Sequence, residues 1–460
     1  MTHRHTRSLT IAAAVAGIAA LTLTGCVDAE VAETGTSAGA SGLPTDLVAA
    51  AVDKAAAIAD GEDLEGTTVS LVGTWGGEER ERFLSTLAPF EEATGVTIDF
   101  TGNEDYETLQ QTSLAAGTPI DVVAAGNLGT VNEYAGSDAI DLNELIGEDV
   151  IADNYAPGFI DSTTVDGGNY GLWTMVDNYM IWYDPSVYEG PAPEDLTWDD
   201  LTAYTDSLAG SGTAAWCMGL SAGANTGWPG SYFVFNLMLK EFGPDLLTGL
   251  ADGTHAWDSD EVRASFARFG EVVADDQTVL GGPDAVLTTD PGAVGAGMYT
   301  DPQQCALEHW GTYTASIILG GDPSLEPGTD LDFMEMPSIT PEYAGANGYG
   351  GTVFTAFADR PEVAAFMEYM ASVESSDLIA STGNWIGANA NIDAEAFPNS
   401  ILAGVSEQLL TGSDQLVPFP IASTPSAVTA AFYTTVAEFV QDPASLDQNL
   451  AAVDAAVAAN

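Results

Sequence analysis

Short apolar runs alternate with longer stretches of helical spacing over residues 67–126. Three of the runs are typical of buried strands: 67–73, 96–102 and 119–126. The two stretches between them, 78–95 and 103–117, repeat apolar residues at helical spacing, and each stops at a glycine. Strands that alternate with helices predict parallel βαβ units and therefore an α/β lobe.

The pattern changes after residue 160. A D-G-G turn joins strand-like runs within 163–175, which predicts a hairpin, and 179–185 is typical of another strand. Residues 197–318 are mostly helical in spacing, and a strand is predicted again at 348–359. Three helices are expected in the rest of the chain: 360–372, 425–441 and 445–458.

The first 25 residues have the pattern of a targeting signal. Arg4 and Arg7 precede an apolar run at 9–23, which is shorter than the roughly 20 residues of a membrane-spanning helix. The run ends in L-T-G-C, which resembles the lipobox of bacterial lipoproteins, where the cysteine is acylated. We therefore predict a lipoprotein signal peptide over 1–25 and lipidation of Cys26. The alternative is a cleaved signal with an incidental cysteine.

Residues 26–66 are expected to be a flexible tether between the lipid and the folded domain. They are rich in small and acidic residues and almost free of aromatic ones. Such a segment buries too little apolar surface to offset its ordering entropy. One part, D-L-V-A-A-A-V-D-K-A-A-A-I-A-D, has the alanine content of a helix.

Size and charge limit the domain organisation and the partners. Roughly 395 residues follow the tether, which exceeds the usual size of a single core and predicts two lobes. The chain has 9 basic and 68 acidic residues and a net charge of −59. That charge repels nucleic acid and anionic lipid, so neither is expected as a partner, whereas a polycation would be attracted. A surface adapted to salt or to low pH is the alternative explanation.

The cysteines and histidines predict a disulfide and no metal site. After Cys26 the chain has only Cys217 and Cys305, and an even pair in an exported protein favours a disulfide over two separate buried thiols. Two of the four histidines lie in the signal, and the Cys and His residues form no cluster with ligand spacing. We expect neither a metal nor another cofactor.

Several motifs along the chain are characteristic of one family. The most specific ones are W-C-M-G-L followed by G-A-N-T-G-W-P-G, G-Y-G-G-T-V-F, and D-R-P-E-V-A-A-F-M-E-Y-M-A-S. Others are W-G-G-E-E, L-A-P-F-E-E-A-T-G-V, A-A-G-T-P-I-D-V, Y-G-L-W with I-W-Y-D-P, and T-W-D-D-L. Together they resemble the extracellular sugar-binding proteins of bacterial ABC importers, of the maltose- and α-glucoside-binding type. The α-glucoside branch is the most similar, and its two cysteines are expected to pair.

The resemblance implies an α/β, two-lobed periplasmic-binding-protein-like fold, with a ligand cleft between the lobes and crossing strands as a hinge. The first lobe would comprise 67–175 plus 350–400, and the second lobe 176–349 plus 401–460. The chain departs from the branch at Thr352, where a carboxylate is usual, and at Trp385, where a smaller residue is common. Both changes lie near the expected cleft.

A sugar needs polar partners for its hydroxyl groups and aromatic rings for its C–H faces, and α/β folds bind ligands at the carboxyl ends of strands. Three candidates follow the first three predicted strands: Glu78, Asn103 and Asn127. Glu78 could instead only stabilise the dipole of the helix that it begins. Asn103 could instead be only a helix N-cap.

The remaining candidates lie at the expected lobe crossings or in glycine-rich loops. Asp177 aligns with a sugar-binding carboxylate of the maltose-binding type, although it could only support the hinge. Trp228 and Trp385 are candidate stacking platforms. Four further residues are expected near them: Ser231, Asp301, Tyr349 and Gly351.

These observations predict a protein that captures an extracellular neutral sugar, an oligosaccharide or α-glucoside, and delivers it to the permease subunits of an ABC importer. A polyamine or peptide binder on the same fold is the alternative. A glycoside hydrolase with Glu78 and Asp177 as its carboxylates is a weaker one, since no catalytic motif is present. We expect a monomer, not an enzyme, held on the outer surface of the cell membrane by its lipid alone.

Overall fold

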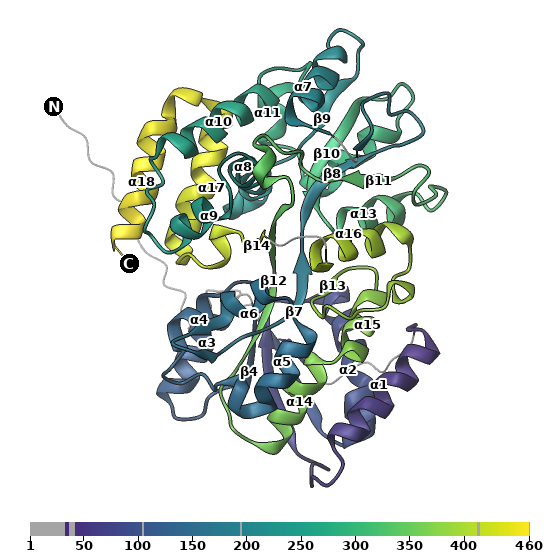
Figure 1. Cartoon of the computed structure of the whole chain (residues 1–460), viewed down its shortest axis with the longest axis vertical. Helices are drawn as coiled ribbons and strands as arrows, with labels where there is room; N and C mark the ends of the chain where they lie inside the picture. The colour runs from purple at the N-terminus through teal and green to yellow at the C-terminus, as the bar shows by residue number, and fades with distance from the viewer. Residues whose placement is uncertain (1–32, 36–41, 104, 194–195, 412–414, 460) are drawn as a thin grey trace, which may run out of the picture. The chain divides into compact units, whose positions relative to one another are not determined.

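Two β-sheets organise the chain, and the computed structural model describes residues 33–35, 42–103, 105–193, 196–411 and 415–459 (Figure 1). The predicted signal peptide and Cys26 lie outside these residues. Residues from Glu33 onward form one unit. We call the part built on the larger sheet the first lobe and the part built on the smaller sheet the second lobe.

The sheet of the first lobe has eight strands in the order β1-β3-β2-β4-β12-β7-β13, with β14 also paired to β12. The neighbours β3, β2 and β4 run parallel, whereas β12 runs antiparallel to β4 and β7. The strand bounds are β1 Glu33–Gly35, β2 Thr68–Gly73, β3 Thr97–Gly102, β4 Val122–Ala125, β7 Leu172–Asp177, β12 Ala346–Ala356, β13 Ile386–Gly387 and β14 Gln415–Pro418.

The sheet of the second lobe has four strands in the order β11-β8-β10-β9. These are β8 Tyr179–Tyr183, β9 Ala214–Cys217, β10 Cys305–Gly311 and β11 Asp332–Met334. Only one residue separates β7 from β8, so the chain passes directly from one sheet to the other. The predicted hairpin is present as β5 Thr164–Val165 and β6 Gly168–Asn169, which pair antiparallel.

Helices flank both sheets. The helices that precede β7 in the sequence are α1 Thr45–Ile58, α2 Gly77–Thr94, α3 Tyr106–Ala115, α4 Gly129–Tyr134, α5 Glu148–Asn154 and α6 Pro157–Thr163. The helices that follow are α7 Trp198–Ser207, α8 Trp228–Phe242, α9 Pro244–Ala251, α10 Asp260–Val272, α11 Gly282–Val286, α12 Pro291–Val294 and α13 Thr314–Gly321. The last are α14 Pro361–Ala371, α15 Val373–Ser381, α16 Ser400–Thr411, α17 Ser426–Gln441 and α18 Leu446–Ala459.

Strand β4 shows why its sequence is apolar throughout. Val122 and Ala124 belong to the core shared with α2, whereas Val123 and Ala125 belong to a second core with Tyr106 of α3. Both faces of the strand are therefore buried, as parallel strands between two layers of helices require. This alternation leaves the loop after β4 free to present side chains at the edge of the sheet.

The expectation of a flexible tether over 26–66 is wrong for its second half. Helix α1 packs against α2, α14 and α15 of the first lobe, and Ala51 and Ala55 on its inner face are fully buried. Leu64 is also buried. The composition argument failed here because small alanines need little volume to pack closely against neighbouring helices.

The predicted disulfide between Cys217 and Cys305 is confirmed, and it joins the end of β9 to the beginning of β10 within the second lobe.

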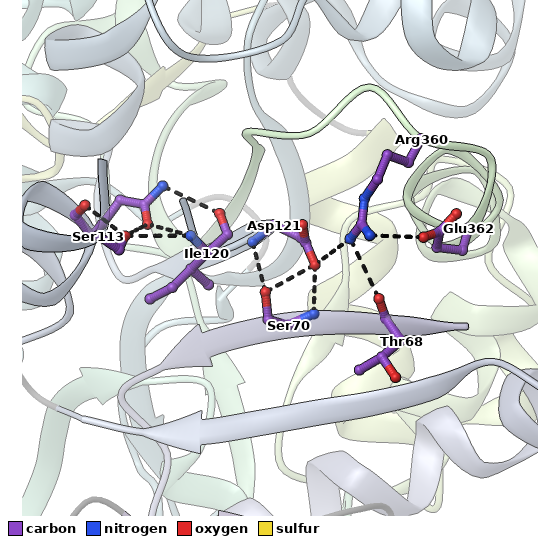
Figure 2. A network of polar contacts seen from close by, with 8 residues as sticks. Thr68, Ser70, Ser113, Ile120, Asp121, Arg360 and Glu362 are labelled. Atoms are coloured by element: carbon purple, nitrogen blue, oxygen red, sulfur yellow. Dashed lines mark hydrogen bonds and ion pairs between the residues drawn. The ribbon is translucent and has the colours of Figure 1, made fainter. Parts of the chain in front are cut away.

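The first lobe has a charged cluster, shown in Figure 2, at the end of its sheet where β2 and β4 begin. There Arg360 contacts Asp121 at 2.6 Å, Glu362 at 3.0 Å and the carbonyl of Thr68 at 3.4 Å. In the part of the chain that the structure describes, no helix is both long and apolar enough to cross a membrane.

Candidate functional site

A cleft of about 930 Å³ lies between the two lobes. We call its side on the first lobe the first wall, which is formed by the loops after β3 and β4 and by α4. The opposite side is the second wall, which is formed by α8, the loop after β14 and α17. The carboxyl ends of the parallel strands β2, β3 and β4 all face this edge of the sheet, because they share one direction. Their loops therefore converge on the cleft.

Of the three candidates that follow the first three predicted strands, Asn127 lines the cleft. Its Oδ1 accepts the N–H of Gly129 at 2.7 Å, and its Nδ2 donates to the hydroxyl of Tyr106 at 3.2 Å. A Cβ atom at residue 129 would lie 2.7 Å from Oδ1, so the glycine makes this close turn possible. These bonds hold the amide in one orientation beside the cleft.

Three acidic residues also line the first wall: Asp105, Glu107 and Glu133. Burial raises the pKa of Glu107, and the charges of Glu133 and Asp105 raise it further. Among the described residues that line the cleft, none is Lys, Arg or His. The wall therefore offers many hydrogen-bond acceptors and no positive charge that could bind an anion.

The second wall combines three aromatic residues with small and hydroxyl-bearing ones. The aromatic residues are Tyr232, Tyr433 and Phe419, of which Phe419 is fully buried. The Tyr232 ring stacks on the Tyr179 ring, with centroids 3.5 Å apart and planes 8° apart, and it meets the Phe419 ring edge-on at 5.2 Å. These contacts fix the orientation of the Tyr232 ring, which remains partly exposed and lines the wall. Such a ring suits the C–H surface of a sugar ring.

The two walls touch each other directly. The N–H of Leu128 donates to the carbonyl of Ala422, and the Asn132 amide donates to the carbonyl of Ser423 at 3.2 Å. These bonds join the loop after β4 to the loop after β14. The structure therefore represents an arrangement in which the lobes are in contact beside the cleft.

Gly350 and Gly351 of β12 form part of the cleft lining. Gly351 has φ of 140°, and a Cβ atom there would overlap the carbonyl oxygen of Met175 on the neighbouring β7. Only glycine allows this close approach of the two strands. The prediction that Gly351 lies at the cleft agrees with this position.

Asp177 lies at the end of β7, opposite Gly350, and is only partly buried. Its Oδ1 accepts the hydroxyl hydrogen of Thr312 at 2.8 Å. Burial raises the pKa of Asp177 to about 6, although the bond from Thr312 opposes the shift. Burial also raises the pKa of Glu79 on α2, and the nearby charge of Asp177 adds to that shift. Asp177 thus joins the two lobes beside the cleft but does not belong to its lining.

Trp228 is partly buried at the start of α8, outside the cleft lining. Its ring meets Tyr232 edge-on at 6.2 Å and Trp310 at 6.3 Å. The aromatic residue of α8 that lines the cleft is Tyr232, one turn further along the helix, and Trp228 packs against it.

Three other candidates are core residues instead of cleft residues. Trp385 is 8% exposed and packs edge-on against Trp75 at 6.1 Å. Tyr349 is fully buried, and its hydroxyl donates to the carbonyl of Gly158 and contacts Ser162 Oγ. Ser231 is fully buried, and its hydroxyl donates to the carbonyl of Trp228 at 2.6 Å. Each was predicted from its place in a motif, but packing within its own lobe takes it out of the cleft.

The last three candidates also lie outside the lining of the cleft. Glu78 is exposed in the first turn of α2, which agrees with the alternative of dipole stabilisation. Asn103 is not the N-cap of α3, which is Asp105; its Oδ1 accepts the Asp105 N–H at 2.8 Å. Asp301 is exposed before β10, at the opposite end of that strand from Thr312.

Sequence reasoning missed most of the aromatic wall and the acidic residues of the first wall. Tyr232 lies in a helix that is apolar on nearly every side, so its sequence pattern is that of a core residue. Phe419 and Tyr433 carry no motif, because their position depends on how β14 and α17 fold back toward the first lobe. Glu107 and Glu133 were among 68 acidic residues, and only the fold singles them out.

Comparisons with known proteins agree with this architecture. The osmoprotective compounds-binding protein GgtB of Synechocystis is 26% identical over 74% of this chain and 81% of its own length. The alpha-glucosides-binding periplasmic protein AglE of Rhizobium meliloti is 29% identical over 84% of this chain and 86% of its own length.

A solved structure and a family model extend the comparison. The bacterial solute receptor AcbH, described with a preference for β-D-galactopyranose, has a TM-score of 0.71 at 16% identity over 85% of this chain and 99% of its own. That likeness shows the two-lobed fold of solute-binding proteins. The model for bacterial extracellular solute-binding proteins matches residues 76–376, which is more than half of the sequence. The chain therefore belongs to the family of bacterial extracellular solute-binding proteins.

Proposed function

We propose that the cleft captures a neutral sugar, an oligosaccharide or an α-glucoside, for an ABC importer. The observation that carries the proposal is the pairing of two unlike walls around one cavity. One wall has an oriented amide and carboxylates that could accept hydrogen bonds from hydroxyl groups. The other has the partly exposed rings of Tyr232 and Tyr433, which could pack on a C–H face. The volume of about 930 Å³ suits a ligand of more than one sugar ring.

The relatives support this substrate class. AglE is named for alpha-glucosides, and the solved structures of similar fold include a chitin oligosaccharide binding protein and a binding protein for cyclic alpha-maltosyl-1,6-maltose from Arthrobacter globiformis. We propose by extension that this chain also delivers its sugar to permease subunits, acts as a monomer and has no catalytic role.

A cationic solute such as a polyamine is the second candidate, and the acidic residues of the first wall favour it. Burial raises the pKa of Glu107, the charges of Glu133 and Asp105 add to that shift, and a bound cation would offset these charges. A sugar would be bound mainly by hydrogen bonds and stacking, which salt hardly screens, whereas attraction of a cation weakens as salt rises.

Titration calorimetry distinguishes the two candidates. We expect at least one of maltose, trehalose, sucrose or maltotriose to bind, with a dissociation constant that changes less than about twofold between low and high ionic strength. Spermidine and putrescine are tested in parallel. If only the polyamines bind, and their affinity falls steeply with added salt, the sugar proposal is wrong.

We also propose that acylated Cys26 holds the protein on the outer surface of the membrane. The basis is the L-T-G-C sequence after an apolar run. Replacing Cys26 with serine should release the protein into the medium or leave the signal uncleaved. A Cys26→Ser protein that is processed normally and still sediments with membranes would contradict the assignment.

A further inference from the structure

A second cavity, of about 340 Å³, lies within the second lobe and shares no lining residue with the cleft. Its walls come from α12, the turn Gly295–Tyr299 that follows it, β10 and α13. Apolar side chains line one side: Ile317, Ile318 and Leu325. Two aromatic residues, Tyr299 and Trp310, and two acidic residues, Glu308 and Asp322, line the rest together with small residues.

Glu308 is the unusual member of this lining. It is 2% exposed, and its Oε2 atom has no hydrogen-bond partner. A Cβ atom at residue 295 would overlap this oxygen, so the glycine there leaves the room that the carboxyl group occupies. An unpartnered buried carboxyl group is costly, so a ligand that pairs with it would be bound favourably.

Other polar groups around the carboxyl group are also unsatisfied. Trp310 Nε1 and Thr314 Oγ1, both on lining residues, have no hydrogen-bond partner. The titratable neighbours are Tyr299, Tyr313, Asp322 and His309. Burial lowers the pKa of His309 to about 3. None of these carries a positive charge at neutral pH, so none of them neutralises Glu308.

We propose that this cavity is a second ligand site that takes a small primary amine. Its ammonium group would pair with Glu308, near the rings of Tyr299 and Trp310, which attract cations. Its hydrocarbon part would lie along Ile317, Ile318 and Leu325. A sugar fits less well because the walls are mainly apolar, and a metal ion fits less well because described residues form no group of three His, Cys, Asp or Glu.

Binding of an amine at this site should release a proton. Burial raises the pKa of Glu308 to about 8, so the empty site holds a protonated carboxyl group at pH 7. The ammonium ion pairs with the carboxylate, and the carboxyl proton passes to the buffer. The release should be close to one proton at pH 7 and fall toward zero above about pH 9.5, where the carboxyl group is already ionised.

Butylammonium chloride serves as the probe, measured by calorimetry at pH 7 in phosphate and in HEPES, whose ionisation enthalpies differ and neither of which contains a primary amine. We expect saturable binding with a buffer-dependent heat that reports about one released proton. Butanol, a neutral molecule of similar shape, should bind more weakly and release none. Glu308→Gln should weaken butylammonium binding by about tenfold or more, because the charge-assisted bond is lost.

A second variant, Ala296→Phe, blocks the cavity at an exposed lining position without touching Glu308. It should abolish butylammonium binding while its thermal unfolding stays near that of the parent. The proposal is overturned if the parent does not bind butylammonium, or if both variants bind it as the parent does. In the latter case the amine occupies the acidic first wall of the cleft, and the sugar proposal is tested separately by its own titrations.

Discussion

The two walls of the cleft differ in chemistry and in how the fold holds them. The first wall is polar and lies on loops after parallel strands, where short turns such as Asn127–Gly129 fix single side chains. The second wall holds the aromatic residues of the cleft together with small and hydroxyl-bearing ones, and it lies on helices and on the loop after β14, where the Tyr232 ring is fixed by stacking on Tyr179. The acidic and amide groups thus come from the rim of a sheet, and the aromatic rings come from elements that pack against a core.

This difference suggests a division of roles between the lobes. Side chains on strand-end loops can each be directed at one hydroxyl group, which gives selectivity. Rings backed by Tyr179 and Trp228 lose little freedom on binding, so they contribute contact area at small entropic cost. The lobe that holds the rings also has the disulfide, whereas the other lobe has the partly exposed Arg360 cluster.

The largest expected effect is on the lobe that holds the aromatic wall. Replacing Cys217 and Cys305 together with alanine opens a loop with a sequence separation of 88. In the chain-entropy model this should lower the free energy of unfolding by about 4–5 kcal/mol, measured by urea denaturation. Reducing agent should destabilise the parent similarly and leave the variant unchanged. A loss below about 1 kcal/mol would show that packing alone holds β9 and β10 together.

Removing a ring of the second wall comes next. Tyr232→Ala deletes a face of the cleft and should weaken binding of the tightest sugar in the screen by about ten- to a hundredfold, or about 1–3 kcal/mol. Tyr232→Phe keeps the ring and its stacking on Tyr179, so it should stay near the parent. Calorimetry on both variants separates the ring from the hydroxyl group; equal losses in the two would contradict a stacking role.

The fold was largely predictable, because each lobe follows local patterns that its tertiary structure keeps. The strand–helix alternation over 67–126 corresponds to β2, α2, β3, α3 and β4, each with apolar residues turned into a core. Helix α1 was missed as part of the lobe because its contacts depend on Ala51 and Ala55, whose small side chains give only a weak apolar signal.

The site was predictable only where local geometry determines it. Asn127 and Gly351, which line the cleft, were expected near it because one follows a strand and the other lies at a predicted lobe crossing. Trp385 and Tyr349 have the same chemistry as the rings of the cleft, yet packing within the first lobe buries them. Which aromatic residue faces the cavity depends on contacts between distant segments, and no local pattern records those.

A smaller effect is expected from the first wall. Asn127→Ala removes the acceptor of the Gly129 N–H and the donor to Tyr106, so it should weaken sugar binding by about tenfold or less, near 1 kcal/mol. Asn127→Asp keeps the acceptor and adds a fourth negative charge beside Asp105, Glu107 and Glu133. That variant should weaken sugar binding but strengthen any spermidine binding. Unchanged affinity for both ligands in both variants would remove Asn127 from the site.

The smallest effect is expected at the far end of the first lobe, in the cluster of Figure 2. Arg360 is 44% exposed, so solvent screens its pairs with Asp121 and Glu362. Asp121 also accepts the N–H and hydroxyl hydrogen of Ser70, so loss of the arginine leaves it partly satisfied. Arg360→Met should therefore lower the free energy of unfolding by only about 0.5–1 kcal/mol, and less at high salt. Arg360→Lys keeps the positive charge but not the forked guanidinium group, so it should recover part of the lost free energy of unfolding.

Sugar affinity should not change in either variant, because the cluster lies at the opposite end of β2 and β4 from the cleft. A tenfold loss of affinity would show that the two ends are coupled.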